Sequence, residues 1–246
     1  MTKGRVVLLS IVVLLGIQAV TATAAMGVEA PYWHVNGKRL GEGESRKATI
    51  KNSTGSEVTL NAKINATSVE VKCKTMESHN MELTGSTKFM DALGIGEIEL
   101  AQCRLIAAGK EQPTCEVPPI KTGTMKLRLW YEGSLAEGGE TIVIVFEPKE
   151  EKEKHLILAE IAINGCAFAG KYKLENRFAT QITPENSEST EGALFTPPSP
   201  SEHAHQPQEG GQEIQVQPQL AASPASLKLK ATAKLSTGEK FGAFSE

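Results

Sequence analysis

The chain has 246 residues, of which 26 are basic and 29 acidic, so its formal net charge is −3 at pH 7. This mildly acidic balance argues against a nucleic-acid partner, which would require a basic face. Asp91 is the only aspartate in the sequence, which excludes aspartate-rich calcium loops and a catalytic aspartate dyad.

The chain begins with the three parts of a signal peptide, residues 1–25. A basic start is followed by an apolar run over residues 6–20 and by small residues up to Ala25. We predict cleavage after Ala24 or Ala25, a secreted or cell-envelope location, and no membrane contact by the mature chain. The alternative is an N-terminal membrane anchor, because residues 6–28 are long enough to span a bilayer.

The mature chain opens with a short strand. Trp33 and Val35 alternate in the manner of a strand, and Asn36 and Gly37 form a strong two-residue turn signal. Trp33 is either a core residue, the commoner role for a tryptophan in a strand, or a ligand-facing aromatic.

Three strands are expected between residues 48 and 73. Residues 48–51 are a short candidate, while residues 57–64 and 68–73 alternate between apolar and polar side chains. This alternation is typical of half-buried antiparallel strands, and it turns Cys73 toward the core. Residues 74–94 show no clear period, so we predict a loop with at most a short strand.

Further strands follow at intervals of 8 to 16 residues. Residues 124–131 place Trp130 on the face opposite Leu127 and Leu129. Residues 141–146 are almost continuously apolar, which predicts a central strand covered on both faces. The remaining candidates are residues 96–103, 156–163 and 166–174.

This spacing predicts an all-β fold, an antiparallel sandwich or a barrel-like domain. The β-rich domain is assigned to residues 26–183. Residues 184–225 are rich in proline, glutamine and serine and predict a disordered low-complexity loop. Residues 226–246 predict a C-terminal β-hairpin that completes the domain.

Four cysteines form an even set behind the leader, which indicates two disulfides. Four cysteines allow three connectivities. We predict Cys103–Cys115 as a local pair and Cys73–Cys166 as a long-range pair.

Known catalytic and cofactor motifs are missing from the sequence. There is no nucleophile elbow, zinc-protease motif, phosphate-binding loop or dinucleotide fingerprint. His203 and His205 could bind a transition metal only weakly, and the cysteine spacings do not match a zinc site. We therefore predict no catalytic residues, no metal site and no cofactor.

The leader, the early Trp-x-Val-Asn-Gly segment, the Cys103-to-Cys115 excursion and the Asn-Gly-Cys segment around Cys166 together resemble a known group. This group is a set of uncharacterised exported β proteins, abundant in some soil actinobacteria. The resemblance covers most of residues 31–175 and the final hairpin. It implies a bacterial, exported protein, but it carries over no activity and no functional residue.

Two classes of function remain open. The first is a non-enzymatic structural or binding protein of the cell surface or exterior, with a cell-envelope glycan or protein as partner and Trp33 and Trp130 as candidate ligand-facing aromatics. The second is an exported hydrolase without a readable motif. We favour the first, because a disulfide-braced sheet can present a binding surface without a catalytic pocket.

Overall fold

The computed structural model describes residues 30–86, 91–132, 141–149, 156–196, 203–205 and 213–245. The predicted signal peptide lies outside these ranges. Within them the chain forms strands and no helix, so no helix in the described part could span a membrane.

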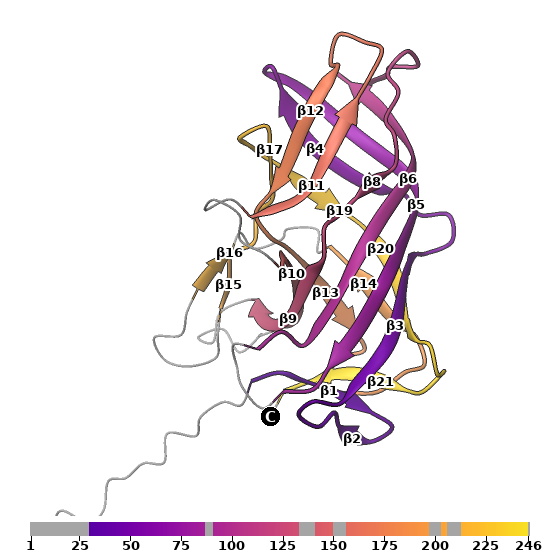
Figure 1. The fold of residues 1–246 in the computed structure, drawn as a ribbon, viewed down its shortest axis with the longest axis vertical. Helices are drawn as coiled ribbons and strands as arrows, with labels where there is room; N and C mark the ends of the chain where they lie inside the picture. The colour runs from indigo at the N-terminus through magenta and orange to yellow at the C-terminus, as the bar shows by residue number, and fades with distance from the viewer. Residues whose placement is uncertain are drawn as a thin grey trace, which may run out of the picture.

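A closed antiparallel barrel forms the lower half of the molecule (Figure 1). β6 pairs with β5 on one side and with β9 on the other, and β20 pairs with both β14 and β3, so the ring of strands has no free edge. The eight described strands, in ring order, are β3 (Ser45–Asn52), β5 (Thr67–Thr84), β6 (Gly94–Ala107), β9 (Met125–Glu132), β10 (Thr141–Pro148), β13 (Phe178–Thr183), β14 (Gly192–Phe195) and β20 (Lys230–Leu235). The predicted all-β, barrel-like class is confirmed.

The barrel interior is filled by alternating apolar side chains of its strands. The inward-facing set on β9 and β10 is Leu127, Leu129, Tyr131, Ile142, Ile144 and Phe146. The opposite face of β10 is also covered, because Val143 and Val145 pack with Trp130 and Val216 in a second cluster outside the barrel. The prediction that residues 141–146 form a strand buried on both faces is confirmed.

A second lobe stands on the barrel, and β5 and β6 run through both (Figure 1). The first half of β5 pairs with β4 (Val58–Ile64), which also carries β19 (Ser226–Lys228). Short strands β7 (Lys110–Glu111) and β8 (Ile120–Lys121) pair with β6. A separate sheet contains β11 (Ile157–Ile163), β12 (Gly170–Glu175), β17 (Gln219–Leu220) and β18 (Ser223–Pro224).

A three-stranded sheet lies at the other end of the barrel. It contains β2 (Lys38–Arg39), β1 (Tyr32–Val35) and β21 (Phe241–Phe244). Asn36 and Gly37 have φ values of 51° and 76°, as the predicted turn between β1 and β2 requires. The expected entry strand is therefore present, and it joins the two ends of the described chain in one sheet.

Three expectations for the chain course are wrong. Residues 74–84 continue strand β5 instead of forming a loop. Residues 184–225 are not a single disordered loop, because β14 belongs to the barrel, and Leu194 and Leu220 are each buried to 1% exposure. The C-terminal strands do not form a hairpin, since β20 pairs with β3 and β14 whereas β21 pairs with β1.

The chain between β14 and β17 also contains two short strands, β15 (His203–His205) and β16 (Glu213–Gln215), which pair with each other. β15 touches the barrel through one register pair with β9. These few described residues indicate a backbone extension of the sheet beside β9.

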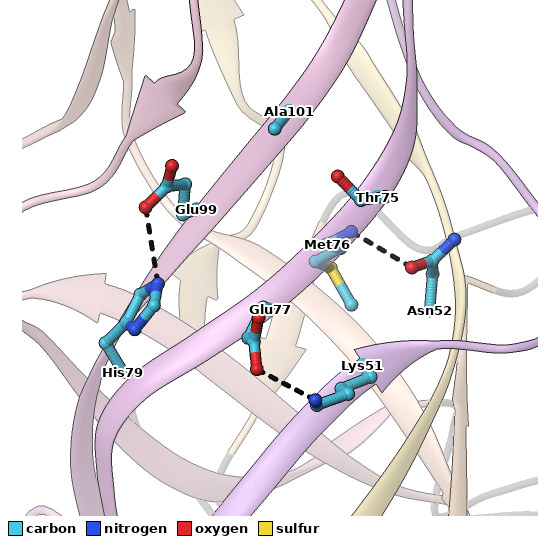
Figure 2. A pocket seen from close by; sticks show the side chains of 8 residues that line it. All are labelled: Lys51, Asn52, Thr75, Met76, Glu77, His79, Glu99 and Ala101. Carbon is cyan, nitrogen blue, oxygen red and sulfur yellow. Dashed lines mark hydrogen bonds and ion pairs between the residues drawn. The ribbon is translucent and has the colours of Figure 1, made fainter.

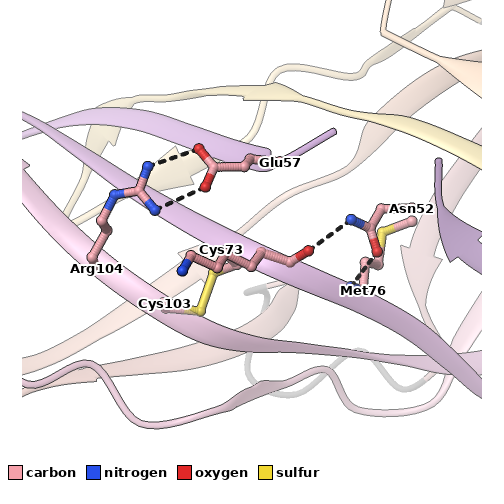
Figure 3. The surroundings of a disulfide bond; sticks show 7 residues. Asn52, Glu57, Cys73, Met76, Cys103 and Arg104 are labelled. Carbon is pink, nitrogen blue, oxygen red and sulfur yellow. Dashed lines mark hydrogen bonds and ion pairs between the residues drawn. A yellow bond between two sulfur atoms is a disulfide. The ribbon is translucent and has the colours of Figure 1, made fainter. Parts of the chain in front are cut away.

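All four cysteines form disulfides, but the predicted pairing is wrong. The bonds are Cys73–Cys103 and Cys115–Cys166. Cys73 and Cys103 are direct register partners on β5 and β6, with their Cα atoms 4.0 Å apart (Figure 3). Loop length does not select connectivity here, because the register of β5 and β6 places Cys73 and Cys103 within the distance that a disulfide requires.

The second disulfide follows from a similar local arrangement in the upper lobe. The backbone of Glu116 exchanges two hydrogen bonds with that of Asn164, at 3.0 and 2.9 Å. This contact places Cys115, the residue before Glu116, beside the tight turn at Gly165. The Cys115–Cys166 disulfide forms there, because Cys166 directly follows Gly165.

Candidate functional site

The two tryptophans are not available as a ligand platform. Trp33 is 1% exposed and donates a hydrogen bond from Nε1 to the carbonyl oxygen of Leu93 at 2.7 Å. Trp130 is 2% exposed and packs in the outer cluster with Val143 and Val145. The core alternative for Trp33 is therefore confirmed, and the ligand-facing role of Trp130 is wrong, because Trp33 lies in the main apolar core and Trp130 in the outer apolar cluster.

The junction between the two lobes is held by polar contacts beside the Cys73–Cys103 disulfide (Figure 3). The Asn52 side chain donates to the carbonyl oxygen of Lys74 at 2.8 Å and accepts from the backbone N–H of Met76 at 3.0 Å. It thus bonds to the backbone of β5 where β5 passes from the upper lobe into the barrel. These contacts position the outer surface of β3 and β5 next to the junction.

A β-bulge on β5 shapes this surface. His79 pairs with Glu97 and Glu82 with Ile95, so two residues of β5 oppose a single residue of β6. The extra residue is accommodated at Asn80, whose φ is 51°. The opposing residue is Gly96, where a Cβ atom would lie only 2.9 Å from the Cα of Met81.

Beside this bulge the ladder between β3 and β5 is interrupted. Lys47 pairs with Glu82 and Lys51 with Glu77, but the residues between them are not register partners. Within this stretch the backbone N–H of Ile50 donates instead to the Ser78 hydroxyl at 2.7 Å. We call the line between β3 and β5, from Lys47 to Lys51, the seam.

The first of two hollows on the outer surface of the seam is the His79 hollow (Figure 2). Its volume is about 370 Å³. It contains charged side chains, one hydroxyl group and one amide. Its lining residues are Lys51, Asn52, Thr75, Met76, Glu77, His79, Glu99 and Ala101.

Four charged residues on four strands form a row of register partners, and three of them line the His79 hollow. Lys51, Glu77, Glu99 and Lys121 are successive register partners on β3, β5, β6 and β8. The Nζ atom of Lys51 lies 2.8 Å from Glu77 Oε1, and that of Lys121 lies 3.2 Å from Glu99 Oε2. Like charges directly opposite each other on a sheet repel, and these lysines offset the repulsion between the two glutamates.

The environment of Glu77 favours a fixed charge over proton transfer. The hydrogen bond and the charge of Lys51 hold the pKa of Glu77 below its usual value. His79 lies with Nε2 3.3 Å from Glu99 Oε2. A general acid needs a pKa raised toward the working pH, and Glu77 is shifted in the opposite direction.

The second hollow, the Asn80 hollow, continues along the seam with a volume of about 400 Å³. Its exposed polar groups come from both strands and from the turn after β20. Its lining residues are Lys47, Ala48, Thr49, Ser78, Asn80, Met81, Glu82 and Ser236. The two hollows share neither residues nor charge pattern, but together they follow one interruption of the ladder.

None of the seam residues was identified from the sequence. The sequence does carry one signal, in residues 74–83. There the spacing between successive buried residues changes from two to three, once between Cys73 and Met76 and again between Ser78 and Met81. Such a shift marks a bulge, and bulges are frequent next to functional sites. A loop was predicted there because the strand period is lost twice in ten residues.

His203 and His205 lie in β15, and the expectation that they form no metal site stays a prediction. In the described part of the chain, histidine, cysteine and acidic side chains do not gather in a group of three able to hold a metal ion.

Comparison with protein-family models, with curated proteins and with solved structures gives no match. The chain is an all-β protein with an eight-stranded antiparallel barrel and two disulfides.

Proposed function

We propose that the protein is a non-enzymatic binding protein that acts outside the cytoplasm, at the cell surface or in the exterior, and that the seam is its binding surface. The observation that carries the proposal is the seam itself. It is an open, polar surface on a closed barrel, with charges held in register across four strands.

The covalent frame supports the proposed location. Disulfides persist in oxidising compartments and are rare in the cytosol. One of the two, Cys73–Cys103, lies on the same strand pair as the His79 hollow. A surface built on rigid, cross-linked strands holds its side chains in place, which lowers the entropic cost of binding.

The charges support binding over catalysis. Lys51 holds the pKa of Glu77 below its usual value, and both partners are more than half exposed, at 53% and 62%. Exposed fixed charges of this kind guide and orient a polar partner. The proposed partners are a glycan or a protein of the cell envelope.

The test measures retention of the purified, disulfide-bonded protein on isolated bacterial cell walls and on immobilised envelope proteins. We expect retention of the wild type and at least a five-fold loss for His79→Ala, which removes a side chain of the His79 hollow. Lys171→Ala is the control, since Lys171 is exposed on β12 in the upper lobe and pairs with Glu160. Equal retention of both variants contradicts the seam as the binding surface.

The same preparation distinguishes the hydrolase alternative. It is incubated with glycan, ester and peptide substrates, and released products are quantified. Turnover that is lost in His79→Ala would overturn the non-enzymatic proposal. Binding without turnover supports it.

A further inference from the structure

The seam has the dimensions of a short extended chain. Lys47 and Lys51 bracket it on β3, four residues apart, and each pairs in register with a glutamate of β5. At roughly 3.4 Å per residue along a strand, the bracketed length is about 14 Å. An extended peptide of four to five residues has this length.

The polar groups along the seam are of the kind that recognise a peptide backbone. Thr49 and Asn80 are exposed on the two sides of the Asn80 hollow, and Thr75 lines the His79 hollow. Hydroxyl and amide side chains can donate to carbonyl oxygens and accept from N–H groups. An extended peptide lying parallel to β3 would present both at regular intervals.

The lining of the two hollows disfavours a sugar chain. Neither lining set contains a tryptophan, a tyrosine or a phenylalanine. A flat aromatic ring offers a large, rigid contact area at low entropic cost, and a sugar ring would find none here. The seam instead offers charge and hydrogen bonds.

The charges of the lining point to a basic side chain on the partner. Two lysines, Lys47 and Lys51, face three glutamates, Glu77, Glu82 and Glu99. Within the lining, the excess of negative charge lies in the His79 hollow, where Glu77 and Glu99 are direct register partners. Outside the lining, Lys121 offsets this excess by pairing with Glu99, and a cation of the partner that replaced Lys121 at Glu99 would take over this role.

Glu99 is the carboxylate best placed to receive that cation. Its side chain is 26% exposed, and its two ionic contacts are with His79 and Lys121. Lys121 is 70% exposed, so its side chain can swing into solvent at little cost. An incoming ammonium or guanidinium group can then take its position.

From the length, the hydrogen-bonding groups and the charge of the seam, we infer that its ligand is an extended peptide segment with a basic side chain that binds Glu99. This inference rests on the proposed binding function and names the class of partner. The backbone of the peptide lies along β3 over both hollows. Its basic side chain enters the His79 hollow.

The test uses the purified, disulfide-bonded protein and a fluorescent six-residue peptide, acetylated and amidated, made of serine and threonine with one central lysine. Matched peptides carry norleucine or glutamate in place of the lysine, and a fourth has N-methylated backbone amides. Fluorescence anisotropy gives the Kd of each. We expect the lysine peptide to bind at least five-fold more tightly than the norleucine and glutamate peptides, and N-methylation to weaken it.

The variant Glu99→Gln should reduce the preference for lysine over norleucine by about five-fold, the size typical of one surface ion pair. Glu160→Gln is the matched control, because Glu160 is a half-exposed strand glutamate paired with Lys171 at 2.9 Å in the other lobe. Circular dichroism checks that both variants keep the fold. An equal effect of the two variants overturns the inference.

A soluble N-acetylated sugar chain serves as the competing ligand. If that chain binds at the seam and no peptide does, the peptide inference fails while the proposed binding function stands. If the protein binds neither the peptides nor the sugar chain and is not retained on cell walls, the peptide inference and the proposed binding function both fail. A lysine peptide that binds equally well to Glu99→Gln also contradicts the inference.

Discussion

Replacing Cys115 and Cys166 together by alanine should destabilise the upper lobe strongly and leave the barrel in place. The disulfide closes a loop of 51 residues, for which the chain-entropy model gives about 4 kcal/mol of stabilisation. The corresponding value for Cys73–Cys103, with a separation of 30 residues, is about 3.6 kcal/mol. Removing either bond should therefore cost a large part of the stability of an ordinary domain.

The assay is urea unfolding of the oxidised wild type and of each double-alanine variant, followed by tryptophan fluorescence and far-UV circular dichroism. Trp33 lies in the three-stranded sheet at the end of the barrel, and Trp130 lies on the barrel itself. Tryptophan fluorescence therefore reports on the barrel half of the molecule. Loss of Cys115–Cys166 should produce an earlier dichroism transition that fluorescence does not follow.

Two results would refute this reasoning. A change of less than about 1 kcal/mol for either variant would contradict the chain-entropy estimate. A Cys103–Cys115 peptide in non-reducing peptide mapping would contradict the register of β5 and β6, on which the connectivity depends.

Two further predictions concern the bulge and the junction. Gly96→Ala should lower the free energy of unfolding in urea by about 1–3 kcal/mol, as overpacking does, because the new Cβ would meet the Met81 backbone. Gly123→Ala is the control and should lower it much less, because a Cβ there has no neighbour within 4 Å. Equal losses in the two variants would contradict the bulge. The two hydrogen bonds from Arg104 lower the pKa of Glu57, so the contribution of this pair is present above the unfolded pKa and is lost as pH falls through the folded pKa. The stability gap between wild type and Glu57→Gln should therefore narrow in acid, and a gap that stays constant from neutral pH to about pH 2 would contradict this assignment.

The sequence predicts strands well wherever one face is continuously apolar. Residues 124–131 and 141–146 correspond closely to β9 and β10, because a period of two, or an unbroken apolar run, survives in the fold. The turn at Asn36 and Gly37 was also predictable, since few residues other than these adopt positive φ values.

The prediction fails where the period breaks for a structural reason. In β5 the buried positions change phase beside Cys73, where the strand leaves one lobe for the other, and again at the Asn80 bulge. The candidate site lies between these two breaks. Its charges come from four strands that are distant in sequence, so their row is created by register and cannot be read along the chain.

The disulfide pairing fails for the same reason. A short loop favours a bond between Cys103 and Cys115, but the register of β5 and β6 places Cys103 directly opposite Cys73. The sequence leaves both a core and a ligand-facing position open for Trp33 and predicts an outward face for Trp130, because a strand pattern cannot show that a second element covers the outer face. For Trp130 that cover includes Val216, which lies far along the chain in a stretch without a strand signal.

The pairing of β3 with β20 has a consequence for the timing of folding. β3 spans residues 45–52 and its barrel neighbour spans residues 230–235, so the ring cannot close until residues 230–235 have emerged. Until then β3 exposes an open edge, which is a site for mispairing and aggregation. Closure over so long a loop is slow compared with local hairpins. A chain that crosses a membrane unfolded would thus complete its barrel on the far side, as one of its last steps.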